Sequence, residues 1–139
     1  MLYLVKFDNQ TEWYDLSQRL DEAVAREWVR RRRFDLVEKR NEAELVFEGS
    51  VRSITMVPVT LDERGRATEY QMTLTVSAQL LDVRGQKPQT LWQDKAFSRR
   101  TSYDVNESAA DYFDRQNLAM DEVSRELAQA LVTAVLEGF

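Results

Sequence analysis

The segment from Tyr70 to Leu80 alternates between two kinds of side chain, and this alternation constrains the fold more than any other feature of the sequence. One set is apolar: Tyr70, Met72, Leu74, Val76, Ala78 and Leu80. The other set is polar but uncharged: Gln71, Thr73, Thr75, Ser77 and Gln79. A period of two residues predicts a β-strand with one buried face. The sequence therefore predicts a long strand whose second face is neutral and rich in hydrogen-bonding groups.

Two further long strands are predicted on either side of this one. The first runs from about Ala43 to Val57, and the second is "LWQDKAFSRRT", residues 91–101. The connections "TLDERGRA" and "DVRGQKPQT" are short and turn-like, which favours an antiparallel meander. Gly49 within the first strand indicates a bulge or a close approach of another backbone. Pro58 indicates either the end of pairing or an edge position.

Two amphipathic helices flank the meander in the sequence. The first is predicted over roughly 15–32, with a capping box formed by Asp15 and Gln18. Its apolar side chains recur every four residues: Leu16, Leu20, Val24 and Trp28. The second is predicted over about 108–137 from a spacing of three or four residues in Met120, Val123, Leu127, Leu131 and Val135. A short first strand, "LYLVKF", precedes the first helix and is predicted to end in a turn at Asp8 and Asn9.

These elements predict an α+β fold of a single domain over residues 1–139. The order β-α-β-β-β-α gives a two-layer sandwich, with two helices packed on one face of a four-stranded mixed sheet. The neutral strip of Gln71, Thr73, Thr75, Ser77 and Gln79 is then expected on the uncovered face. Both a solvated surface and a surface that packs against a polar, partly dehydrated environment account for it. Neutral hydroxyls and amides are desolvated at lower cost than unpaired charges.

Composition excludes several kinds of chemistry. The chain has no Cys and no His, which removes thiol nucleophiles, disulfides, Ser-His-Asp triads and most zinc sites. A net charge of −5 argues against a general nucleic-acid binder. We expect no enzyme activity, cofactor or metal, because turn preference accounts for the scattered carboxylates of Asp62, Glu63, Asp82, Asp94 and Asp104.

Positive charge is carried mainly by arginine, with fifteen Arg against four Lys. The run from Arg30 to Arg33 is interpreted as a solvated helix C-terminus that complements the helix dipole, with an anion-binding patch as the alternative. No stretch approaches the ~18–20 apolar residues of a spanning helix. No signal peptide precedes "LYLV", so an exported protein would have lost its leader from this sequence.

Four segments resemble one known family, the LPS-assembly lipoproteins (LptE). The most specific is "GRATEYQMTLTVSAQLLD", and the others are "VKFDNQTEW", "RRRFDLVEKRNEAELVFEGSV" and "DYFDRQNLAMDEVSRELAQALV". The resemblance covers nearly the whole chain in the right order. It implies a non-enzymatic protein that plugs the lumen of a large β-barrel partner (LptD), helps to assemble that barrel and binds lipopolysaccharide. It also implies attachment to the periplasmic side of the outer membrane through a lipidated N-terminal cysteine, which this sequence lacks; without that anchor the chain is expected to be soluble.

The resemblance also implies site residues. Basic residues in the loop before the Glu-Tyr strand and near the start of the last helix are linked to lipopolysaccharide binding, which here indicates Arg64, Arg66 and Arg115. Arg99 and Arg100 are candidates for the same patch, with an ordinary surface role as the alternative. The expected interface with the barrel is the neutral strip. A second hypothesis is a periplasmic adaptor that binds a partner protein through a sheet edge offered by "LYLVKF" or the meander.

Overall fold

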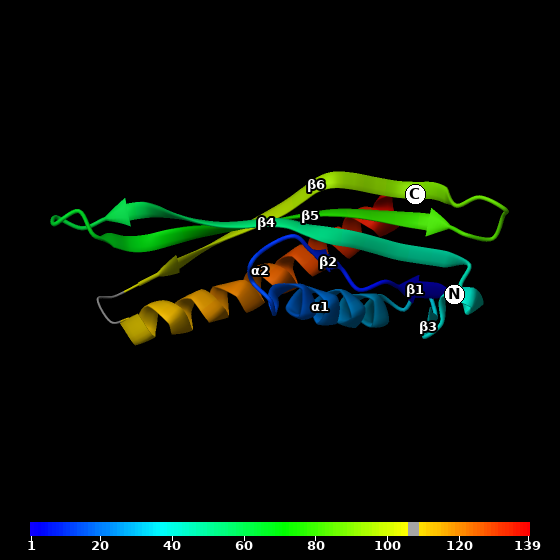
Figure 1. Cartoon of the computed structure of the whole chain (residues 1–139), viewed down its shortest axis with the longest axis horizontal. Helices are drawn as coiled ribbons and strands as arrows, with labels where there is room; N and C mark the ends of the chain where they lie inside the picture. The colour runs from blue at the N-terminus through cyan, green and yellow to red at the C-terminus, as the bar shows by residue number, and fades with distance from the viewer. Residues whose placement is uncertain (106–108) are drawn as a thin grey trace.

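A computed structural model describes residues 1–105 and 109–139 and confirms the α+β class (Figure 1). The helices are α1 (Leu16–Arg31) and α2 (Ala109–Gly138), with a short 3₁₀ turn at Arg40–Glu42. The strands are β1 (Leu2–Leu4), β2 (Asp8–Asn9), β3 (Leu36–Val37), β4 (Leu45–Leu61), β5 (Ala67–Asp82) and β6 (Gln89–Asp104). The predicted start of the second helix at 108 lies outside the described residues.

The sheet has six strands rather than the predicted four, because β2 and β3 add two residues each. Its order is β3-β1-β4-β5-β6, with β2 also pairing with β4. The β1, β2 and β3 pairings are parallel, and β4, β5 and β6 form the predicted antiparallel meander. Both helices lie on the same side of the sheet, and the β4–β5 hairpin projects well beyond them (Figure 1). The result is a two-layer sandwich with a long protruding arm.

The core fills the space between the helices and one sheet face. Every predicted stripe residue of α1 is buried, and Trp28 and Phe47 are fully buried with ring centroids 5.7 Å apart in an edge-to-face arrangement. Such an aromatic pair contributes about 0.5–1.5 kcal/mol beyond its buried area. On β5 the apolar set points into this core, and Met72, Leu74, Val76 and Leu80 have no exposed surface. The sequence prediction of a strand with one buried face is confirmed.

Gly49 marks a close backbone approach. A Cβ at this position would lie 2.2 Å from the Ser77 carbonyl oxygen on β5 and 2.9 Å from the Phe7 ring. The register of β4 against β5 shifts elsewhere, between Val51 and Ser53 and twice between Pro58 and Leu61. Pro58 does not end the strand, because it still pairs with Tyr70. Among the described residues β4 has no partner on its other side beyond Val51, so the edge alternative for Pro58 is the correct one.

Two local predictions were wrong. Asp15 makes no side-chain cap bond to the helix, and its backbone is αR (φ −91°, ψ −2°); its carboxylate instead accepts a hydrogen bond from Arg19 at 2.9 Å. Asp8 and Asn9 form a strand and not a turn, pairing with Ser50 and Val51. The turn follows one step later, because the Asn9 side chain accepts hydrogen bonds from the backbone and hydroxyl of Thr11.

Candidate functional site

The uncovered sheet face carries the neutral strip of β5 across its centre. Gln71, Thr73, Thr75, Ser77 and Gln79 are all half-buried and point away from the helices. Their direct partners on β4, in the same order, are Val57, Thr55, Ser53, Ser50 and Glu48. Four of them also have direct partners on β6: Gln71 with Ser102, Thr73 with Arg100, Thr75 with Ser98, and Gln79 with Gln93. Hydroxyls therefore face one another between β4 and β5 along the middle of this face, and Ser98 extends the row of Ser53 and Thr75 onto β6.

Cross-strand hydrogen bonds hold one end of this array of hydroxyls. The hydroxyls of Ser50 and Ser77 lie 2.9 Å apart, and the Gln79 amide donates to the Glu48 carboxylate at 2.7 Å. Further along, Thr73 and Thr75 have no side-chain hydrogen bond within the part of the chain that the structure describes. The face therefore offers unused donors and acceptors without an unpaired buried charge, which suits a polar partner surface.

The hairpin tip is organised by Asp62. The chain turns at Gly65, whose φ of +77° lies in the left-handed region that favours glycine. One carboxylate oxygen of Asp62 accepts the backbone N–H groups of Arg64 and Arg66, at 2.8 and 2.9 Å. The hydrogen bond from the Arg66 backbone, followed by the other arginine contacts, holds the pKa of Asp62 below its usual value. Arg64 and Arg66 are thereby displayed on either side of the tip, and both are exposed.

The arm that carries these arginines also exposes apolar side chains. Val57, Val59 and Leu61 on β4 are 47%, 48% and 60% exposed. The sequence reasoning missed them because it ended this strand near Val57, although their alternation continues the strand period. The third predicted binding residue, Arg115, lies on α2, where its guanidinium is 3.4 Å from the Asp111 carboxylate. Figure 1 shows the arm extending past the first turn of that helix.

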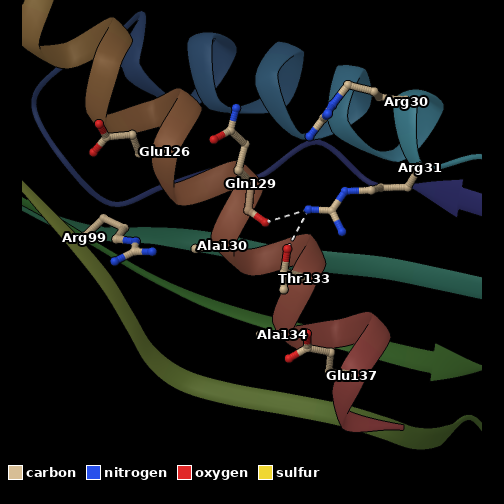
Figure 2. A pocket seen from close by; sticks show the side chains of 9 residues that line it. All are labelled: Arg30, Arg31, Arg99, Glu126, Gln129, Ala130, Thr133, Ala134 and Glu137. Atoms are coloured by element: carbon tan, nitrogen blue, oxygen red, sulfur yellow. Dashed lines mark hydrogen bonds between the residues drawn. The ribbon is translucent and has the colours of Figure 1, made fainter.

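A cleft of about 670 Å³ lies where α1, α2 and β6 meet (Figure 2). Arg30 and Arg31 enter it from α1, Arg99 enters from β6, and Ala130 and Ala134 of α2 contribute small side chains. The cleft could not be predicted from the sequence, because the proximity of these three elements depends on how the helices pack across the sheet.

The arginine run is more than a solvated helix end. Glu27, only 5% exposed, accepts hydrogen bonds from Arg30 at 2.6 Å and from Arg31 at 2.7 Å. Burial alone would raise the pKa of Glu27, and the two arginines outweigh it, so the pKa lies below its usual value. Arg31 also donates to the Thr133 hydroxyl at 2.5 Å and so ties α1 to α2 (Figure 2). Arg30 is mostly exposed, as expected of a helix C-terminus.

The scattered carboxylates serve local turns. Asp62, Asp82 and Asp94 each accept the backbone N–H of the residue two positions ahead. Hydrogen bonds from Arg84 lower the pKa of Asp82 to about 2. Among residues 1–105 and 109–139, no three acidic side chains are grouped so as to hold a metal ion. None of the helices in the described part of the chain combines the length and apolarity needed to span a bilayer.

Several solved structures share this fold. A hypothetical protein from Chlamydia trachomatis aligns with a TM-score of 0.70 at 13% identity, over 99% of this chain and 95% of its own. An uncharacterized lipoprotein B from Nitrosomonas europaea aligns with a TM-score of 0.59 at 15% identity, over 98% of this chain and 83% of its own. The rare lipoprotein B from Shewanella oneidensis aligns with a TM-score of 0.52 at 17% identity, over 97% of this chain and 91% of its own. At these identities the likeness shows the fold alone.

The sequence identifies the family. The model of the LptE lipopolysaccharide-assembly family matches residues 1–135, so this chain belongs to that family. The predicted resemblance is confirmed. No curated protein is similar enough in sequence to count as a match.

Proposed function

We propose that this protein is a non-catalytic component of lipopolysaccharide transport that docks inside the lumen of the translocon barrel, LptD, and contacts lipopolysaccharide through its hairpin tip. The observation that carries the proposal is the uncovered sheet face, which has an uncharged polar central strand, β5, flanked by Glu48 on β4 and Arg100 on β6, and is free of any covering layer among the described residues. Its position opposite the helices leaves it available to a partner.

A barrel lumen is a polar and crowded environment. Docking there removes water from both surfaces, and a charge that loses its water without gaining a partner costs several kcal/mol. The hydroxyls of Thr73, Thr75 and Ser77 avoid that cost, since they donate or accept as the opposite wall requires. We assign Gln71 and Gln79 to the same interface, because their amides extend the neutral strip at both ends.

The hairpin arm offers chemistry that suits an amphiphile. Arg64 and Arg66 present guanidinium groups to phosphates, and an arginine makes charge-assisted hydrogen bonds worth about 1.5–3 kcal/mol each. The exposed Val57, Val59 and Leu61 lie on the same arm, where acyl chains of a bound lipid would contact them. Arg66 and Arg115 each form an ion pair with a carboxylate four residues away, Arg66 with Asp62 at 3.3 Å and Arg115 with Asp111 at 3.4 Å. We assign all three arginines to the site, with Arg64 and Arg66 placed together at the tip.

Membership of the LptE family supports a location at the outer membrane. We propose the periplasmic side of the outer membrane, with a lipid anchor attached to the N-terminal end of the chain. The strand β1 that follows this end is held between β3 and β4, so an anchor would connect to a fixed part of the sheet.

The tip assignment is tested by Arg64→Ala combined with Arg66→Ala. Asp62 would still accept the two backbone N–H groups, so the turn and the melting temperature should be preserved. Binding of purified lipopolysaccharide should weaken by roughly tenfold or more. The matched control is Arg32→Ala with Arg33→Ala, which removes the same charge at the end of α1. Unchanged binding in the tip variant, or an equal loss in the control, would show that the tip is not the binding site.

A further inference from the structure

Strand β6 forms one edge of the sheet over its full length. It contains 16 residues, and β5 is its only neighbour among residues 1–105 and 109–139. A strand in this position presents a row of backbone N–H and C=O groups that can pair with another extended chain. The strand proposed from the sequence to offer an edge, "LYLVKF", has none, because β1 is paired on both sides.

The middle of this edge is strongly basic. Lys95, Arg99 and Arg100 are all exposed, and no hydrogen bond or ion pair occupies their side chains within the described part of the chain. No acidic residue occurs between Lys95 and Asp104. The edge therefore carries three available cations within six residues.

These cations lie on both faces of the strand. Arg99 is opposite Leu74, whose side chain is buried beneath the helices, so Arg99 points to the helix side. Arg100 is opposite Thr73 and lies on the uncovered side. Successive residues of an added strand also point to opposite faces. Two adjacent acidic residues in such a strand would therefore reach one arginine each.

The helix side also has room for the incoming side chains. Arg99 lines the cleft beside α2, where Ala130 and Ala134 leave space next to the strand (Figure 2). Arg30 and Arg31 stand on the far side of this cleft, although both are engaged by Glu27. Glu126 and Glu137 also line this cleft, but neither bonds to Arg99, so the Arg99 guanidinium is the cation there that an incoming carboxylate can pair with.

We propose that the β6 edge binds an extended protein segment with adjacent acidic residues, which adds to the sheet as a further strand. Backbone hydrogen bonds would hold this segment, and carboxylates to Arg99 and Arg100 would select it. A second copy of this chain is disfavoured as the partner, because two β6 edges would bring their cations together. This inference is independent of lipopolysaccharide transport and uses the β6 edge, which borders the neutral strip where Arg100 lies opposite Thr73.

The experiment is a titration of the isotope-labelled 139-residue chain with a synthetic peptide, followed by backbone amide NMR. The probe is Thr-Val-Thr-Glu-Asp-Glu-Thr-Val-Thr. We expect saturable shifts concentrated on residues 93–102, which weaken as salt is added. Arg99→Gln with Arg100→Gln should weaken binding by roughly tenfold or more. The matched control, Arg32→Gln with Arg33→Gln, should bind like the unaltered protein.

Two further peptides separate strand addition from simple charge attraction. A version that is N-methylated at alternate backbone amides keeps the charges and blocks strand pairing, and should not bind. A version with lysines in place of the acidic residues should not bind either. The proposal is overturned if the N-methylated peptide binds as well as the probe, if the shifts map to the hairpin tip or the neutral strip, or if no shift occurs at millimolar peptide.

Discussion

Replacing Gly49 by alanine tests how tightly β4 and β5 must approach to form the uncovered face. The added Cβ would lie 2.2 Å from the Ser77 carbonyl oxygen and 3.1 Å from the Ala78 Cα, well inside the 3.4–4 Å of ordinary van der Waals contact. Both atoms belong to the backbone, so no side-chain rotation relieves the overlap. The strands must separate locally, next to the Ser50–Ser77 hydrogen bond.

The expected loss of stability is moderate and measurable. Overpacking costs about 1–3 kcal/mol, and a backbone clash belongs at the upper end of that range. Alanine also has less conformational entropy than glycine in the unfolded chain, which raises the free energy of unfolding by about 0.4–1 kcal/mol. The net loss is about 2 kcal/mol, or a fall in melting temperature of roughly 8 °C.

Thermal unfolding followed by circular dichroism measures this effect. Gly85→Ala is the matched control, because the nearest atom to its added Cβ is the Lys87 carbonyl oxygen at 3.9 Å. The control should unfold like the unaltered protein. If Gly49→Ala also unfolds at the unaltered temperature, the argument from strand spacing is refuted.

Two other variants test the uncovered face and the helix pair. Thr75→Glu should change the free energy of unfolding by no more than about 0.5 kcal/mol. It should weaken binding to the barrel by roughly 100-fold in a pull-down, because docking would bury an unpaired charge. The control Gln18→Glu adds the same charge on α1 and should bind normally. Glu27 stabilises the fold above its unfolded pKa of about 4.5, and that contribution is lost as the pH falls through its lowered folded pKa. Glu27→Gln, which leaves Arg30 and Arg31 without their carboxylate, should therefore be less stable than the unaltered protein at pH 7, and urea titrations should show the difference shrinking below pH 4.5; a constant difference would exclude this role.

The sequence predicted those parts of the fold that repeat over many residues. The four-residue spacing in α1 and the alternation in β5 each extend over several side chains, so one atypical residue does not change the predicted element. The predicted range 15–32 for α1 compares with the observed Leu16–Arg31. The short strands β2 and β3 were missed because two residues carry no period and their pairing depends on the neighbouring strand.

The site was predictable only where it lies on one element. The neutral strip belongs to β5 alone, and its alternation shows directly which side chains share a face. The cleft of Arg31, Arg99 and Ala134 joins three elements far apart in sequence, so no local pattern indicates it. The capping box at Asp15 failed for a related reason, since its carboxylate bonds to Arg19, which also reaches Asp121 on α2.

The most direct test of the central claim is co-expression of the tagged protein with the lipopolysaccharide translocon barrel from the same genome, followed by co-purification in detergent. Docking of the uncovered face in the barrel lumen predicts a stable one-to-one complex that persists through size-exclusion chromatography. Two well-folded proteins that never co-elute would contradict it.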